Sequence, residues 1–338
     1  MNRWRRPSIW GWIAVGAMLG SIPIPAEAQQ ARRFYRIGVV NDAASASHPT
    51  VEGLKAGLRE LGLEEDRDVT FDIRFTKGDT QAARAQAASL VTEGVDLLFT
   101  SHEGSTQAAK DVTQRIPIIF TLVGNPVAAN LLASTLWETS TAARLSRPGA
   151  NLTGISSLGT ELAPKRLETL KRLIPTLRRV WAIYHATDPS ALAAVLKAQE
   201  TAPFFQLTLI AKPVFSPEQV AQVLRELKPG DAVLAPDSDA LGIPAMILEA
   251  SLSSRVPAIF PTAVWVARGG LVSYGPDYYA QGIQAARLVA KILRGTQPQD
   301  LPVEGADRIE MAVNLKTAAL LRVKVPSKVL LRADKLEQ

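Results

Sequence analysis

Short apolar runs alternate with segments of helical periodicity along almost the whole chain after residue 34. The run at 35–40 is followed by the segment 51–61, where apolar side chains recur at helical spacing. Residues 69–75 then carry an apolar side chain at every second position, as a strand does. Strands and helices that alternate in this order predict an α/β fold whose parallel sheets are covered by helices on both faces.

The same alternation occurs twice, once before about residue 150 and once after about residue 155. A chain of 338 residues also exceeds what one hydrophobic core usually supports. We therefore expect two doubly wound, Rossmann-like lobes. The predicted strands lie at 35–40, 69–75, 95–99, 116–121, 180–184, 205–210, 232–235, 258–260 and 271–274. The predicted helices lie at 51–61, 80–91, 105–113, 165–173, 189–200, 217–227, 243–253 and 278–293.

The N-terminus has the three parts of a secretory signal. Arg3, Arg5 and Arg6 are basic, residues 9–24 are mostly apolar, and 26–28 read Ala-Glu-Ala. The apolar part falls short of the ~20 residues that a membrane-spanning helix needs. We expect a signal peptide over 1–28 and a periplasmic protein that is soluble after cleavage. An uncleaved anchor is the alternative, and export by the Sec or the twin-arginine route stays open.

The chain contains no cysteine. Disulfides, thiol nucleophiles, iron–sulfur clusters and a lipid-modified cysteine are therefore excluded. The net charge of +6 is mild for this length. We expect a solvated helix face rather than a nucleic-acid surface for the basic residues Lys165, Arg166, Lys171, Arg172, Arg178 and Arg179.

Polar loops follow the predicted strands and lead directly into helices. In open parallel sheets, ligands bind beyond the carboxyl ends of the strands, so these loops predict a ligand cleft. Some of the polar residues could instead be ordinary helix caps. We expect Asp237 and Asp239 to pair with an ammonium or hydroxyl, and Ser101, Ser105 and Thr121 to donate to a carboxylate. The other candidate ligand-binding residues in these loops are Asn41, Asp42, His102, Asn125 and Thr262.

Motifs of catalytic or metal sites are missing from the sequence. It contains three histidines, none at H-E-x-x-H spacing, and it has no G-x-S-x-G, Walker A or G-x-G-x-x-G pattern. We predict no enzyme activity, no cofactor and no metal ion. A periplasmic hydrolase is the alternative class of protein. Turnover of an ester or amide that is lost when His102 is changed would support it.

Seven segments, taken in chain order, carry a family likeness. They are 36–39, 53–62, 95–98, 116–120, Arg-Pro-Gly-Ala-Asn-Leu-Thr-Gly at 147–154, 256–260 and Tyr-Gly-Pro-Asp-Tyr-Tyr-Ala-Gln-Gly at 274–282. With this set the chain resembles the periplasmic substrate-binding proteins of ABC transporters with the type I periplasmic binding fold, and among them the tryptophan and tyrosine binders. Two segments depart from the family pattern: 130–143, with Trp137, looks like an insertion, and the loop 101–104 is unusually polar and bulky.

The resemblance implies three crossings between the lobes. Lobe 1 would hold 31–153 plus 276–300, and lobe 2 would hold 154–275 plus 301–338. The ligand would lie between the lobes, with Tyr274 and Asp277 of the hinge beside it.

The function implied is the solute-binding component of an ABC importer, which captures an amino acid or an aromatic or carboxylate compound. Its partners would be a small-molecule ligand and an ABC permease in the inner membrane, with no nucleic acid, and it would be a monomer. A ligand sensor that presents its liganded state to a membrane kinase is the alternative.

Overall fold

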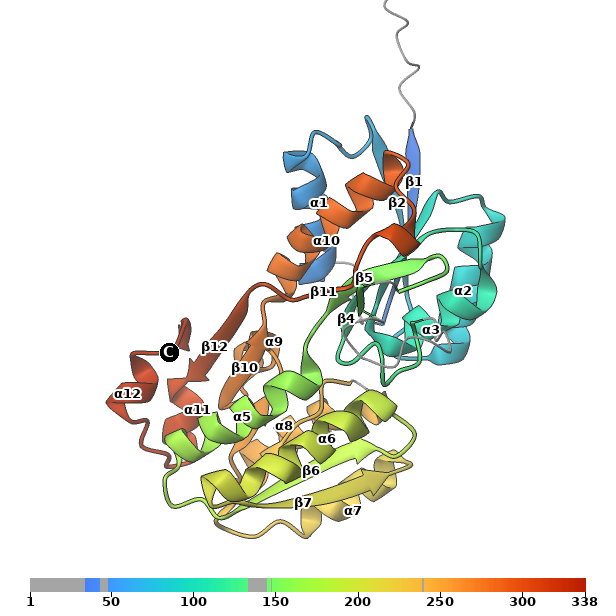
Figure 1. Cartoon of the computed structure of the whole chain (residues 1–338). Helices are drawn as coiled ribbons and strands as arrows, with labels where there is room; N and C mark the ends of the chain where they lie inside the picture. Colours follow the sequence, from blue (N-terminus) through green and yellow to red (C-terminus); the bar gives the residue numbers. More distant parts are fainter. Residues whose placement is uncertain (1–33, 43–47, 133–144, 147, 239) are drawn as a thin grey trace, which may run out of the picture. The chain divides into compact units, whose positions relative to one another are not determined.

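Two sheets built mostly of parallel strands organise the protein in the computed structural model (Figure 1). The structure describes residues 34–42, 48–132, 145–146, 148–238 and 240–338. The predicted signal peptide and most of the predicted insertion, including Trp137, lie outside the described residues.

The first sheet has the strand order β11-β5-β4-β3-β1-β2, and its described pairs are all parallel. Its strands are β1 (Tyr35–Asn41), β2 (Val69–Phe75), β3 (Leu97–Ser101), β4 (Ile118–Val123), β5 (Leu152–Ser156) and β11 (Glu304–Gly305). The helices that pack on it are α1 (Pro49–Glu60), α2 (Thr80–Thr92), α3 (His102–Val112) and α10 (Tyr278–Leu293).

The second sheet has the order β13-β12-β10-β9-β8-β6-β7, in which β10 and β12 run antiparallel. Its strands are β6 (Arg179–His185), β7 (Thr208–Val214), β8 (Asp231–Leu234), β9 (Ala258–Phe260), β10 (Val272–Pro276), β12 (Ile309–Asn314) and β13 (Lys335–Glu337). Its helices are α5 (Gly159–Leu173), α6 (Pro189–Thr201), α7 (Pro217–Arg225), α8 (Ile243–Ser254), α9 (Ala263–Ala267), α11 (Leu315–Leu320) and α12 (Ser327–Leu330).

Each sheet buries an apolar layer on both faces. In β3 the neighbours Leu98 and Phe99 are fully buried in different clusters, because successive side chains of a strand point to opposite faces. Phe99 packs with the cluster that contains α1 and α10, and Leu98 packs with the cluster that contains α2 and α3. The α/β fold with two parallel-rich, doubly wound sheets is thereby confirmed.

Helix α10 comes late in the chain but packs against α1 of the first sheet. The two helices approach so closely that a Cβ on Gly282 would lie 2.1 Å from the carbonyl oxygen of Thr50. Only glycine tolerates that approach, so this residue sets the helix–helix distance. The chain therefore returns to the first sheet after β10, but residues 34–338 form one compact unit, and the lobe boundaries stay a prediction.

The main differences from the predicted elements lie in the second half of the chain. Helix α5 begins at Gly159, six residues before the predicted start at Lys165. The predicted strand at 205–210 lies at 208–214 instead, because Phe205 ends a short 3₁₀ helix and Gln206 turns the chain with a φ of 55°. Among the residues that the structure describes, no helix combines the length and apolar character needed to cross a membrane.

Candidate functional site

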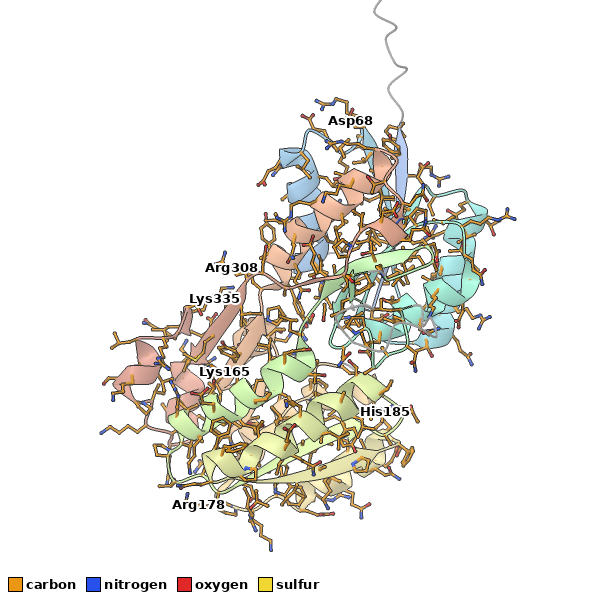
Figure 2. All side chains as sticks on the ribbon, in the orientation of Figure 1. Asp68, Lys165, Arg178, His185, Arg308 and Lys335 are labelled. Atoms are coloured by element: carbon orange, nitrogen blue, oxygen red, sulfur yellow. The ribbon has the colours of Figure 1, made fainter. Side chains whose placement is uncertain are left out.

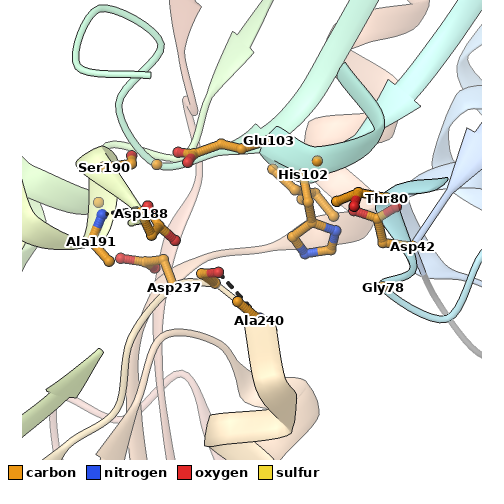
Figure 3. A pocket seen from close by; sticks show the side chains of 15 residues that line it. Asp42, Gly78, Thr80, His102, Glu103, Asp188, Ser190, Ala191, Asp237 and Ala240 are labelled. Carbon is orange, nitrogen blue, oxygen red and sulfur yellow. Dashed lines mark hydrogen bonds between the residues drawn. The ribbon is translucent and has the colours of Figure 1, made fainter. Parts of the chain in front are cut away.

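A pocket lies where strand ends of both sheets meet (Figure 3). We call it the inner pocket; its volume is about 100 Å³, against the roughly 10–15 Å³ that one water molecule needs. It is lined by Asp42, Gly78, Thr80, His102, Glu103, Gly104, Leu122, Gly124, Gly159, Asp188, Ser190, Ala191, Asp237, Ser238 and Ala240. These residues follow β1, β2, β3, β5, β6 and β8, or lie at the end of β4 and directly after it. Ligands of parallel sheets bind beyond the carboxyl ends of the strands, and the pocket has this position.

A wider space, which we call the outer cavity, adjoins the inner pocket and shares seven of its lining residues, among them Glu103 and Asp188. Its volume is about 710 Å³. That size falls in the range of small-molecule sites, which is about 300–1,000 Å³. The two spaces together can hold a solute of amino-acid size.

The first sheet contributes Asp42 and His102 to the inner pocket. The hydroxyl of Thr76 donates to Asp42 Oδ1 at 2.9 Å, which fixes this carboxylate at the end of β1. His102 opens α3 with a φ of 65°, a left-handed conformation that is rare for a residue with a side chain. The residue is 9 % exposed, and Figure 3 shows the ring pointing into the pocket. The strained turn between β3 and α3 therefore aims an imidazole at the ligand space.

The second sheet contributes Asp188 and Asp237. Asp188 caps α6, and its Oδ1 accepts a hydrogen bond from the Ala191 amide at 2.9 Å. Asp237 follows β8 and accepts two hydrogen bonds from Arg166, at 2.6 Å from Nη1 and 2.9 Å from Nη2. The position of each carboxylate is thus fixed by the protein before any ligand arrives.

The burial of Arg166 contradicts the prediction of a solvated basic face on 165–179. It is 1 % exposed, and its Nε donates to the carbonyl of Tyr274 at 2.8 Å. Its neighbour Lys165 does lie on the exposed side of α5 (Figure 2). The prediction was wrong for Arg166 because one side of α5 packs inward, and the planar guanidinium there matches the Asp237 carboxylate.

Two glycines let the two sides of the pocket approach. A Cβ on Gly124 would lie 3.2 Å from Ser190 Oγ, across the pocket. A Cβ on Gly159 would lie 2.7 Å from Asp237 Oδ2 and 3.1 Å from the Gly124 Cα. Any side chain at Gly159 would therefore push against a carboxylate that Arg166 holds in place.

Glu103, in the first turn of α3, has an altered acidity. Burial raises the pKa of its carboxyl well above the ordinary value, and the charge of Asp188 raises it further, with a smaller contribution from Asp237. Figure 3 shows Glu103 extending toward Ser190, on the side of the pocket where Asp188 and Asp237 lie. Acidic groups from the two sheets therefore face one another here.

His48 lies close to this site, at the start of α1. Its ring centroid is 5.7 Å from that of Tyr278, and the ring centroid of His102 is 6.5 Å from that of the same tyrosine. Burial lowers the pKa of His48 to about 4, and repulsion from His102 and Arg268 adds to the effect. His48 is thus a neutral group at pH 7 whose Nδ1 accepts from the Thr50 amide.

The structure brings three of the predicted site residues to the inner pocket, namely Asp42, His102 and Asp237. The predicted hydroxyl donors do not line this pocket; they are buried and donate to residues of β1 and β3. Ser101 Oγ donates to Asn41 Oδ1 at 3.0 Å, the Ser105 hydroxyl donates to the Ser101 carbonyl, and Thr121 Oγ1 donates to the Thr100 carbonyl at 3.2 Å.

The remaining predicted residues lie elsewhere or are engaged in the fold. Asn125 donates to Thr160 Oγ1 at 2.9 Å, and buried Thr262 precedes α9. Asp277 caps α10, while Tyr274 lines a separate cavity beside β12 and α12. Asp239 lies outside the described residues.

Sequence reasoning did not select Glu103, Asp188, Ser190, Gly124 or Gly159 as site residues. Asp188 was recognisable only as a helix cap, and Glu103 only as part of an unusually polar loop. Among the described residues, no group of three or more His, Asp or Glu side chains is arranged to hold a metal ion.

Two mostly parallel sheets whose strand ends line one polar pocket define a bilobal α/β ligand-binding protein. The family profile described as "ABC transporter substrate binding protein" matches residues 39–337. The chain belongs to this family.

Individual relatives agree with this assignment. The chain is 26% identical over 280 residues to a tyrosine-binding protein of Clostridioides difficile. The matched region covers 81% of this chain and 78% of that protein. A solved conserved domain protein of Vibrio cholerae is similar with a TM-score of 0.78 and 26% identity, covering 90% of this chain and 99% of that one. An ABC domain of Streptococcus pneumoniae in complex with L-Trp gives a TM-score of 0.77 and 25% identity over 89% and 99%.

Proposed function

We propose that the chain is the solute-binding component of an ABC importer, which captures a small organic solute in the periplasm and delivers it to a permease. One observation carries the proposal: the inner pocket is lined by strand-end residues of both sheets, so that a single solute there contacts both sides. Family membership, which is that of binding proteins, supports it. A cleavable signal over residues 1–28 would export the chain to the compartment where such a solute is met.

The proposed mechanism is reversible capture by closure. The two lobes, with the boundaries given above, would rotate about the crossing segments, and a solute that contacts both would stabilise the closed arrangement. Preset carboxylates such as Asp237, clamped by Arg166, reduce the conformational entropy that binding removes. No covalent step is needed for this function.

The first solutes to test are amino acids with apolar or aromatic side chains and their derivatives. The relatives support this choice, since one is named for tyrosine and another was solved with L-Trp. The volume of the outer cavity suits molecules of this size.

Solute binding is tested by mass spectrometry of whatever is released when natively purified protein is denatured, followed by thermal shift across a metabolite set. A solute at 100 times its Kd adds about 2.7 kcal/mol of stability, which corresponds to roughly 5 °C in Tm for a chain of this length. If no solute co-purifies and none raises Tm, the proposal fails. Deletion of the gene that encodes this protein should then also abolish uptake of the identified solute by the cells that produce it. This experiment tests the link to a permease.

A further inference from the structure

The inner pocket is lined by acidic side chains. Four of its lining residues are acidic, namely Asp42, Glu103, Asp188 and Asp237, and the described lining includes no lysine or arginine. An anionic solute group would meet this negative field, whereas a cationic one would be attracted by it.

The charges of these carboxylates are balanced unequally. Asp237 is neutralised by buried Arg166 in a two-point contact. In the part of the chain that the structure describes, neither Glu103 nor Asp188 forms an ion pair with a cationic side chain. An enclosed carboxylate without a cation is costly unless it takes up a proton or a positive group arrives. The pKa of Glu103 is raised, first by burial and then by the charge of Asp188, as expected for a carboxyl group without a cationic partner.

A second, independent feature of the same pocket asks for a hydrogen-bond donor. His102 as a residue is 9 % exposed, and its buried Nδ1 has no hydrogen-bond partner among the described residues. Figure 3 shows this ring between Asp42 and the carboxylates of the second sheet. A neutral imidazole nitrogen accepts a hydrogen bond from an N–H group. A solute nitrogen with several N–H donors would satisfy His102 together with the carboxylates.

The helix N-termini at the pocket do not offer an anion site. A helix N-terminus attracts negative charge, but Glu103 occupies the first turn of α3 and Asp188 caps α6. The protein's own carboxylates already take these positions. A carboxylate of the solute would therefore be placed against carboxylates of the protein.

We propose that the inner pocket selects a solute through a cationic nitrogen, an amine or a guanidinium, bound by Glu103 and Asp188 with His102 as an additional acceptor. This inference rests on the proposed function and specifies its substrate class. The pocket prefers an amine without a neighbouring carboxylate over the corresponding amino acid.

Isothermal titration calorimetry with matched solutes tests the preference. Two sets contain an amino acid, its decarboxylated amine and its deaminated acid: tryptophan, tryptamine and indole-3-propionate, and tyrosine, tyramine and 3-(4-hydroxyphenyl)propionate. A third set pairs arginine with its decarboxylated amine, agmatine. We expect at least one amine to bind at least tenfold more tightly than its amino acid, and the acids not to bind. If an amino acid or a deaminated acid binds more tightly than its amine, this inference is wrong while solute binding stands. If nothing binds here or in the wider metabolite set, both proposals fail.

Two conservative variants test the residues. Glu103→Gln and Asp188→Asn remove a charge without shortening the side chain, and asparagine still caps α6. We expect each substitution to lower the affinity for the amine at least tenfold. Glu200→Gln, on the exposed end of the same helix α6, is the matched control and should leave affinity unchanged. If Glu103→Gln and Asp188→Asn bind the amine as tightly as the unchanged protein and Glu200→Gln do, the inference is wrong.

The pH dependence separates a direct ionic contact from a structural role. Because the pKa of Glu103 is raised, amine affinity should increase as pH rises from the ordinary carboxyl range, where the carboxyl is protonated, toward neutrality. In Glu103→Gln this increase should disappear while melting temperature at low pH is retained. An unchanged pH profile in the variant would overturn the assignment to Glu103.

Discussion

The clamp of Arg166 on Asp237 offers a sharp test of how the pocket is built. The Arg166 side chain is 2% exposed, and the Asp237 side chain is 17% exposed. Replacing Arg166 with Met keeps an unbranched side chain but leaves Asp237 without its cation and the Tyr274 carbonyl without its donor. Removal of one partner of a buried pair costs about 3–5 kcal/mol. Because Asp237 opens on the pocket and water can reach it, we expect Arg166→Met to lose about 3 kcal/mol.

The assay is urea denaturation of the solute-free protein at pH 7, followed by tryptophan fluorescence and circular dichroism. The control is Arg172→Met on the same helix, whose side chain is 46% exposed and pairs with Glu168 at the surface. Such a surface pair contributes about 0–1 kcal/mol. The double variant Arg166→Met/Asp237→Asn should be more stable than Arg166→Met alone, because the unpaired charge is gone. A loss below 1 kcal/mol for Arg166→Met, or a double variant that is weaker still, would refute the reasoning.

Three further changes test the site and its supports. Gly159→Ala places a Cβ 2.7 Å from Asp237 Oδ2, so solute affinity measured by calorimetry should fall at least tenfold; unchanged affinity would show that the clamp yields. Gly282→Ala places a Cβ 2.1 Å from the Thr50 carbonyl oxygen; urea unfolding should show a loss of roughly 2–4 kcal/mol, and a loss under about 1 kcal/mol would mean that α1 and α10 separate easily. The pKa of His48 is lowered from 6.5 to about 4, so its neutral form contributes stability above pH 6.5 that is lost as pH falls toward 4, up to about 2–3 kcal/mol. His48→Gln should lack that loss, and parallel curves of unfolding free energy against pH would contradict the role of His48.

Much of the fold is predictable from the sequence because its causes are local. The alternation in 69–75 and the leucine spacing in 51–61 correspond to β2 and α1 within two residues. Errors arise where a local pattern is ambiguous, as at Phe205, where an apolar run ends a 3₁₀ helix and the strand begins after the turn. The antiparallel β12 was not predicted, because its pairing with β10 is set by contacts between strands more than thirty residues apart.

The site is predictable as a place but less so as a list of residues. Strand-end loops locate it, since the carboxyl ends of parallel strands always share one edge of a sheet. Whether a given polar side chain faces the pocket is decided by the local backbone conformation, which differs sharply between neighbouring residues. Ser101 and His102 are neighbours, yet the serine bonds inward to Asn41 while the histidine, at a φ of 65°, turns toward the pocket.

The sequence by itself determines the α/β class, the two-sheet organisation and the edge at which a solute would bind, because periodicity and loop position depend on nearest neighbours. Only the tertiary structure reveals that Arg166 is buried against Asp237, seventy-one residues away, and that Glu103 faces Asp188. Charge balance in a pocket depends on distances between segments that are remote in the chain, and no local pattern encodes those distances.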